Sequence, residues 1–143
     1  MFCDTSTLAK YYVQEKESAA VRTALHAASQ VVLSELAKAE LMAVFHRRLR
    51  EGRWSQLDFV AHCRQFARDD AVGQWSWLPL DGVIVEQAVK TYTLLPANIF
   101  LRTSDCLHLM TALHHGFAEI HTHDSHQFAA AIALGLKAVA IKP

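Results

Sequence analysis

Four acidic residues stand at positions where secondary structure alone gives a carboxylate little reason to be. Asp4 ends the first apolar stretch of the chain, and Asp124 closes a short expected strand. Glu40 interrupts the apolar stripe of an expected helix, and Asp105 opens another. Carboxylate oxygens are preferred ligands of hard divalent cations such as Mg²⁺ and Mn²⁺, and such ions often act on phosphodiester bonds. The pattern therefore predicts a site that collects negative charge around a metal ion.

Glu40 is the most informative of the four, because the neighbouring positions on its helical face are apolar. The residues three and four positions away are Leu36, Ala37, Ala43 and Val44, which makes this the face expected to be buried. A buried carboxylate without a partner is costly. Glu40 is therefore expected to meet a cation, either Arg47 on the same face or a metal ion.

The other three carboxylates also have ordinary structural explanations. Asp4 and Asp124 can each cap the helix that follows them. Asp105, three residues after Arg102, is favoured by the dipole in the first turn of a helix. However, Asp4 and Asp124 both end expected strands, and the carboxyl ends of parallel strands are where α/β sheets bind ligands. A shared site and local capping both remain open.

The histidines offer a competing metal site. His121, His123 and His126 lie close together in the sequence, so a zinc or nickel centre is conceivable. On an alternating strand, His121 and His123 should face away from Asp124. The chain contains neither an H-E-x-x-H motif nor paired cysteines, so we interpret these histidines as surface or supporting residues. It also lacks a glycine-rich phosphate loop, which excludes nucleotide binding of that type.

Strands and helices alternate along the chain. Strands are expected at 1–4, 31–33, 75–80, 119–123 and 137–142, and helices from residue 5 and over 17–28, 35–50, 54–71, 83–95, 103–115 and 125–134. This order predicts a parallel sheet with helices on both faces, a three-layer α/β/α arrangement. The length of 143 residues predicts one domain, 1–143.

The charge balance limits how the protein can bind nucleic acid. With 14 basic and 14 acidic residues the formal net charge is zero, so the chain cannot coat a polyanion by charge alone. Contact must be local or bridged by metal. The densest basic cluster comprises Arg47, Arg48, Arg50 and Arg53. It can hold RNA phosphates or simply be the solvated end of a helix.

The three cysteines, Cys3, Cys63 and Cys106, are odd in number and widely spaced. This usage is typical of a reducing compartment. The opening residues lack the apolar core of a signal peptide, and no apolar run approaches the ~20 residues of a membrane span. We therefore expect a cytoplasmic protein without a membrane association.

Four motifs together resemble a known family: Asp4-Thr5-Ser6, Ser34 to Glu40, the block Leu101-Arg102-Thr103-Ser104-Asp105-Cys106-Leu107-His108-Leu109, and Thr122-His123-Asp124. In this order they resemble the PIN-domain ribonucleases, and in particular the VapC-type toxins of toxin–antitoxin pairs. The resemblance implies a PIN-like parallel sheet flanked by helices, with Asp4, Glu40, Asp105 and Asp124 as the metal-binding carboxylates. It also implies that Ser6 and Thr122 support them with hydroxyl groups.

The resemblance further implies an Mg²⁺- or Mn²⁺-dependent endoribonuclease that forms a homodimer, cleaves structured RNA such as tRNA or rRNA, and is neutralised by a small VapB-like antitoxin. An antitoxin helix would dock in an apolar groove and place an arginine near the carboxylates. The expected groove residues are Leu41, Phe45, Leu49, Trp54, Phe59 and Phe66. Two alternatives stay open: a housekeeping RNA-processing or DNA-structure nuclease, and a catalytically silent PIN-like binding module.

Overall fold

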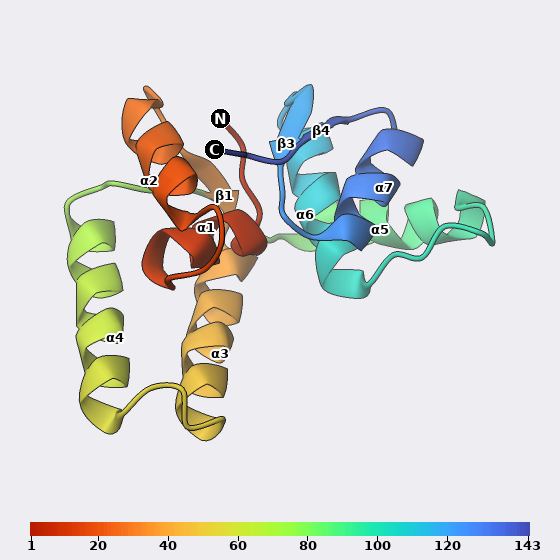
Figure 1. Ribbon diagram of the computed structural model, residues 1–143. Helices are drawn as coiled ribbons and strands as arrows, with labels where there is room; N and C mark the ends of the chain where they lie inside the picture. Colours follow the sequence, from red (N-terminus) through yellow and green to blue (C-terminus); the bar gives the residue numbers. More distant parts are fainter.

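Parallel strands form the centre of the molecule (Figure 1). The structure is a computed structural model that describes residues 1–143. Its strands are β1 (Val32–Ser34), β2 (Ser76–Leu78), β3 (Glu119–His121) and β4 (Lys137–Val139). β1 pairs with β2 and β3 pairs with β4, both in parallel. Parallel bridges from Phe2 to Val32 and from Cys3 to His121 join the two pairs. The order is therefore β2, β1, residues 2–3, β3, β4, which confirms the expected parallel arrangement.

Seven helices cover the strands on two sides. They are α1 (Thr5–Tyr12), α2 (Ser18–Ala27), α3 (Leu36–Arg50), α4 (Gln56–Ala71), α5 (Gly82–Leu94), α6 (Thr103–His114) and α7 (Ser125–Ala133). Helices α1–α4 share one hydrophobic core, and α5–α7 share a second. Figure 1 shows the two groups on opposite sides of the strands. The expected α/β fold with helices on both faces is confirmed. None of the helices is both long and apolar enough to cross a lipid bilayer.

The alternation of side chains along the strands separates the two cores. Phe2, Val32 and Ile120 belong to the core under α5–α7, whereas Cys3 and Leu33 belong to the core under α1–α4. Successive residues of a strand point to opposite faces, and both faces are covered here. This explains why adjacent residues in Phe2-Cys3 and in Val32-Leu33 are both apolar.

Most element boundaries lie close to the expected ones, with one difference that affects the site. β3 ends at His121 and not at residue 123. Beyond it, two backbone N–H groups bond to side chains: that of His123 donates to Ser6 Oγ (2.7 Å) and that of Asp124 to Thr122 Oγ1 (3.0 Å). Side-chain hydroxyls compete with the strand ladder in this way, so the chain turns out of the sheet at Thr122.

Helices α3 and α4 form an antiparallel arm that extends away from the strands (Figure 1). A buried hydrogen-bond network anchors α4 to the rest of the fold. The Tyr12 hydroxyl donates to Asp69 Oδ2 (2.8 Å) and accepts from Trp75 Nε1 (2.9 Å). Gln65 donates to the other Asp69 oxygen (2.6 Å). The buried Asp69 carboxylate is tolerated because both of its oxygens accept hydrogen bonds.

We expect Tyr12→Phe to lower the free energy of unfolding by about 1–3 kcal/mol, because it removes a donor to a buried carboxylate and the acceptor of an indole N–H. Urea unfolding measures the change. Tyr11→Phe is the matched control, because the Tyr11 hydroxyl bonds Gln74 at a partly buried position. Equal losses from both substitutions would contradict the anchoring role of Tyr12.

Candidate functional site

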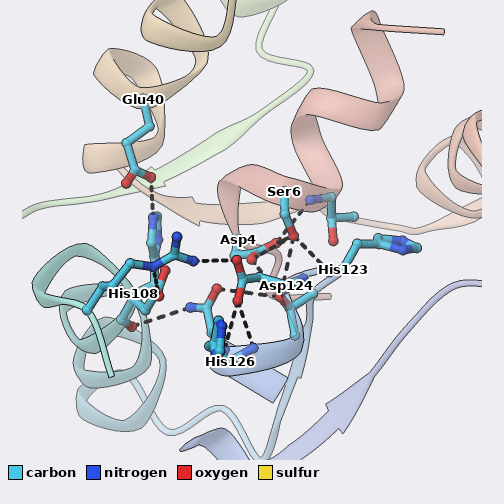
Figure 2. Close-up of polar contacts among 12 residues, drawn as sticks. Asp4, Ser6, Glu40, His108, His123, Asp124 and His126 are labelled. Atoms are coloured by element: carbon cyan, nitrogen blue, oxygen red, sulfur yellow. Dashed lines mark hydrogen bonds and ion pairs between the residues drawn. The ribbon is translucent and has the colours of Figure 1, made fainter. Parts of the chain in front are cut away.

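The four carboxylates line one cleft, although they are far apart in the sequence. This acidic cleft has a volume of about 470 Å³ and is lined by Asp4, Glu40, Asp105 and Asp124. Its walls come from the start of α1, the middle of α3, the start of α6 and the turn after β3. Figure 2 shows Asp4 and Asp124 side by side, with Glu40 beyond His108. The carboxyl ends of the strands bring these segments together, as the sheet order requires.

Asp4 both caps a helix and faces the cleft. Its Oδ1 accepts from the backbone N–H of Thr7 (3.0 Å) at the start of α1. Its Oδ2 accepts from the Thr122 hydroxyl (2.7 Å), and the Ser6 hydroxyl lies 2.8 Å from both carboxylate oxygens. Asp4 is almost fully buried. Capping and a place in the acidic cleft are therefore compatible, and Ser6 and Thr122 both support this carboxylate.

Asp124 divides its two oxygens in a similar way. Oδ1 accepts from the backbone N–H groups of His126 (2.9 Å) and Gln127 (3.0 Å), which caps α7. Oδ2 accepts from the Arg102 guanidinium. Burial raises the pKa of Asp124, but the Gln127 N–H and Arg102 together bring it below the usual value. Asp124 is thus held as a carboxylate whose Oδ2 faces the cleft.

Burial and the neighbouring acidic groups destabilise the ionised form of Asp105. Asp105 lies in the first turn of α6, and Arg102 Nε donates to its Oδ2 (2.8 Å). Burial raises the pKa of Asp105, Arg102 lowers it, and the negative charges of Asp124 and Asp4 raise it further. The pKa of Asp105 is raised overall. The repulsion between neighbouring carboxylates expected from the sequence is therefore present here.

Glu40 is held by Thr5 and His108. Its Oε2 accepts from the Thr5 hydroxyl and lies 2.7 Å from His108 Nε2. Arg47 lines the cleft but does not bond to Glu40, so of the two partners expected for Glu40, an Arg47 ion pair or a metal ion, the ion pair is not formed. Burial raises the pKa of Glu40, but the hydrogen bond and charge of His108 and the Thr5 hydroxyl bring it below the usual value. Because Glu40 is only partly buried, a weaker partner than a guanidinium is sufficient.

His108 is buried, with 1% of its surface exposed, and its Nδ1 has no hydrogen-bond partner. A carboxylate oxygen only accepts hydrogen bonds, so His108 Nε2 carries the N–H that donates to Glu40.

Sequence reasoning missed the roles of Thr5, Arg102 and His108 in the cleft. Helical spacing could have revealed one of them: His108 lies three residues after Asp105, so both lie on the same face of α6. Arg102 was considered only as a local partner of Asp105. Its second contact, with Asp124, joins residues 22 positions apart. Local spacing carries no information about such a contact.

The histidine site is not found. No group of three or more histidine, cysteine or acidic side chains is arranged to hold a metal ion in this conformation. His121 is buried, with Nδ1 3.3 Å from the Phe2 carbonyl oxygen. His123 lies at the edge of the acidic cleft, and its ring points away from Asp124, as expected (Figure 2). The zinc or nickel alternative loses its support.

The donor set of the acidic cleft nevertheless suits a hard divalent cation, because it consists of carboxylate oxygens with adjacent hydroxyl groups. The positive charge between Asp105 and Asp124 is supplied here by Arg102. A metal ion bound through these two carboxylate oxygens would compete with both ion pairs.

The basic cluster divides into two parts. Arg47 lines the acidic cleft, and Arg47 and Arg50 both line an adjoining cavity. Arg48 is paired with Glu15, and Arg53 is paired with Glu51. Only Arg47 and Arg50 therefore lie near the candidate site without an acidic partner.

Half of the expected antitoxin groove is core. Leu41 and Phe45 are completely buried and Phe66 is 9% exposed, all in the core shared by α1–α4. They cannot form the wall of an open groove, because α3 and α4 turn this face toward each other and toward α1. Leu49, Trp54 and Phe59 remain partly exposed, so the expectation survives only for these three.

A family model described as the PIN domain matches residues 1–133. No curated protein sequence matches the chain significantly. Among solved structures, the chain is similar to VapC20 of Mycobacterium tuberculosis, a toxin that cleaves the sarcin–ricin loop. The TM-score is 0.70 and the identity 16%, over 90% of this chain and 93% of that one.

Two further structures belong to toxin–antitoxin systems. A toxin–antitoxin complex from Klebsiella pneumoniae is similar with a TM-score of 0.60 and 20% identity, over 90% of this chain and 89% of that one. VapBC2 from Rickettsia felis, bound to a promoter DNA fragment, gives a TM-score of 0.67 and 12% identity over 98% of both chains. At these identities the likeness is one of fold.

We expect Asp105→Asn and Asp124→Asn to shift the melting temperature in opposite directions in EDTA at pH 7.5. The raised pKa of Asp105 means that its ionised form opposes folding at any pH above that pKa. The lowered pKa of Asp124 means that its ionised form adds stability, which is lost as the pH falls through that pKa. Asp105→Asn should raise the melting temperature and Asp124→Asn should lower it.

Differential scanning calorimetry would measure shifts of about 2–4 °C, the size that ~1 kcal/mol produces in a domain near this length. A lower melting temperature for both variants would mean that Arg102 fully offsets the repulsion at Asp105.

Proposed function

The chain belongs to the PIN-domain family, and from that premise we propose that it is a metal-dependent endoribonuclease toxin restrained by an antitoxin. The observation that carries the proposal is the convergence of Asp4, Glu40, Asp105 and Asp124 on one cleft. The proposed substrate is structured RNA, either tRNA or rRNA. The reaction is hydrolysis of a phosphodiester bond that leaves a 5′ phosphate and a 3′ hydroxyl.

The four carboxylates are the proposed ligands of one or two Mg²⁺ or Mn²⁺ ions. When bound, such an ion lowers the pKa of a water molecule and stabilises charge on the leaving oxygen. The protein's own part is to present ionised oxygens in fixed positions. Glu40 and Asp124 have lowered pKa values, so both carboxyls are ionised at neutral pH and bind a cation without releasing a proton.

The supporting residues orient these ligands. Ser6 and Thr122 hold the Asp4 carboxylate, while Thr5 and His108 hold Glu40. Partners of this kind limit the rotation of a ligand and are typical of metal sites. Burial raises the pKa of Asp105, and the charges of Asp124 and Asp4 raise it further. A bound cation would relieve the part that comes from repulsion, which favours metal binding to the metal-free cleft.

RNA contact is proposed at the acidic cleft and beside it. Arg47 and Arg50 adjoin the carboxylates and can neutralise phosphates on either side of the scissile bond. Because basic and acidic residues are equal in number, few basic side chains are free to make such phosphate contacts. Recognition of a folded RNA would therefore depend on its shape around a few phosphates, which agrees with a structured substrate.

The toxin role is supported by the solved structures. VapC20 cleaves the sarcin–ricin loop, and the Klebsiella and Rickettsia structures contain a toxin with its antitoxin. We propose that an antitoxin helix docks near Leu49, Trp54 and Phe59, at the end of the α3–α4 arm. A homodimer is also proposed, because α5 exposes apolar side chains that a second copy could cover. They are Val85, Val89 and Tyr92.

Two alternatives make different predictions. A housekeeping nuclease would require the same carboxylates but would not arrest growth when expressed alone. A catalytically silent binding module would not require divalent ions for any activity. The conjunction of four acidic side chains with their supporting hydroxyls favours an enzyme, because such a cluster is costly to maintain without a cation.

We expect Asp4→Asn to reduce RNA cleavage by at least about a hundredfold, since losing even a supporting group of a metal site costs 10–100-fold. Cleavage of total tRNA and of ribosomal RNA with Mn²⁺ or Mg²⁺, followed on denaturing gels, would measure this, and EDTA should abolish it. Asp81→Asn is the matched control, because Asp81 also caps a helix but lies outside the cleft. Full activity of Asp4→Asn, or activity unaffected by EDTA, would reject the metal site.

Expression of the chain alone should arrest bacterial growth, and Asp4→Asn should remove the arrest because RNA is no longer cut. Co-expression with the adjacent short gene, if that gene encodes a DNA-binding protein, should restore growth to the wild-type chain. Colony counts after induction measure both effects. Normal growth with the active chain would favour the housekeeping nuclease.

A further inference from the structure

Arg102 is the cation that joins two of the proposed ligands. It stands at the N-cap of α6 and makes no side-chain cap of that helix. Its Nε lies 2.8 Å from Asp105 Oδ2, and its Nη2 donates to Asp124 Oδ2. Half of the Arg102 side chain remains exposed, and the residue lines the acidic cleft. The guanidinium is therefore held at the solvent side of the carboxylates instead of being sealed into the fold.

Arg102 occupies two carboxylate oxygens for which a metal ion at Asp105 and Asp124 would compete. Asp124 Oδ1 is taken by two backbone N–H groups of α7, which leaves Oδ2 as the oxygen facing the cleft. Arg102 occupies that oxygen and an oxygen of Asp105 at the same time. A divalent cation bound by Asp105 Oδ2 and Asp124 Oδ2 therefore competes with the guanidinium, and a displaced guanidinium needs a new partner.

We propose that Arg102 exchanges partners as the site is loaded: it holds Asp105 and Asp124 together in the metal-free chain, and binds a phosphate of the RNA substrate once a divalent cation replaces it. This rests on the proposed function and adds a substrate-binding residue to it. The planar guanidinium offers paired N–H donors that match a phosphate as well as a carboxylate. Its exposed position at the acidic cleft lets it reach a substrate without rearrangement of α6.

Binding of Mn²⁺ without RNA tests the first half. Isothermal titration calorimetry of Arg102→Gln should show Mn²⁺ binding about three- to tenfold tighter than the wild type, because two partly exposed ion pairs, each of modest strength, no longer compete. Arg102→Lys should lie between the two, since it keeps the charge but loses the two-pronged geometry. It also serves if Arg102→Gln fails to fold.

Arg47→Gln is the matched control for this measurement. It removes a positive charge from the same cleft but breaks no ion pair with Asp105 or Asp124. Its effect on Mn²⁺ affinity should be smaller than that of Arg102→Gln. If the two substitutions tighten Mn²⁺ binding equally, or if Arg102→Gln leaves it unchanged or weaker, the exchange is overturned.

RNA binding tests the second half. Anisotropy of a fluorescein-labelled sarcin–ricin-loop oligonucleotide, with Ca²⁺ in place of Mn²⁺ and RNA integrity checked on gels, should show three- to tenfold weaker binding by Arg102→Gln. The slope of log affinity against log salt should fall by about 0.7–0.9, the value for one lost phosphate contact. Arg53→Gln, outside the cleft, should change neither.

The exchange predicts that Arg102→Gln binds Mn²⁺ more tightly but RNA more weakly. A residue that only stabilises the fold would not change the two affinities in opposite directions. If Arg102→Gln binds Mn²⁺ more tightly but binds RNA with unchanged affinity and slope, the phosphate half is overturned. If the wild type does not bind Mn²⁺, the proposed function fails and the exchange fails with it. If the wild type binds Mn²⁺ and Arg102→Gln binds it no more tightly, only the exchange is lost.

Discussion

The backbone pairing of residues 1–4 holds the two halves of the molecule together and places the first carboxylate. Cys3 donates to Val32 and Val32 to Met1, while His121 donates to Phe2 and Asp4 to His121, at 2.9–3.1 Å. Residues 2–3, the shortest extended segment, therefore occupy the middle position of the sheet. Because Asp4 follows directly and caps α1, the register of this segment determines where its carboxylate lies.

The chain gathers like charges in one cleft and offsets the repulsion locally. Helix caps neutralise part of the charge on Asp4 and Asp124, since the N-termini of α1 and α7 present backbone N–H groups to them. Glu40 relies on a hydroxyl and an imidazole, and Asp105 relies on Arg102. The remaining strain falls on Asp105, whose pKa is raised, whereas the pKa values of Glu40 and Asp124 are lowered.

Capping and ligation are not competing explanations for these residues. One oxygen of Asp4 serves α1 and the other receives a hydroxyl bond, and Asp124 repeats the arrangement at α7. A carboxylate fixed by a helix N-terminus loses little conformational entropy when it binds a cation, because its side chain is already ordered. The hydrogen bonds that cap α1 and α7 thus also fix the positions of the Asp4 and Asp124 oxygens in the candidate site. Arg102 pairs with two of the carboxylates, Asp105 and Asp124.

The class of fold and the four carboxylates that line the cleft could be predicted from the sequence. Short, largely apolar segments that alternate with amphipathic helices predict a covered parallel sheet, and an acidic residue on the apolar face of α3 predicts a polar partner. Glycines with positive φ at 52, 116 and 135 end helices near the expected positions, because few other residues adopt that conformation.

The partners of the carboxylates depend on how the elements pack in three dimensions. Glu40 meets His108, 68 residues away, instead of Arg47 on its own helix, and Arg102 reaches Asp124 across 22 residues. The tertiary structure also decided that Leu41, Phe45 and Phe66 are core, since apolar residues look alike whether a neighbouring helix or solvent covers them. Periodicity identifies the face of an element, but the partner of that face depends on how the elements pack, and this is a property of the whole chain.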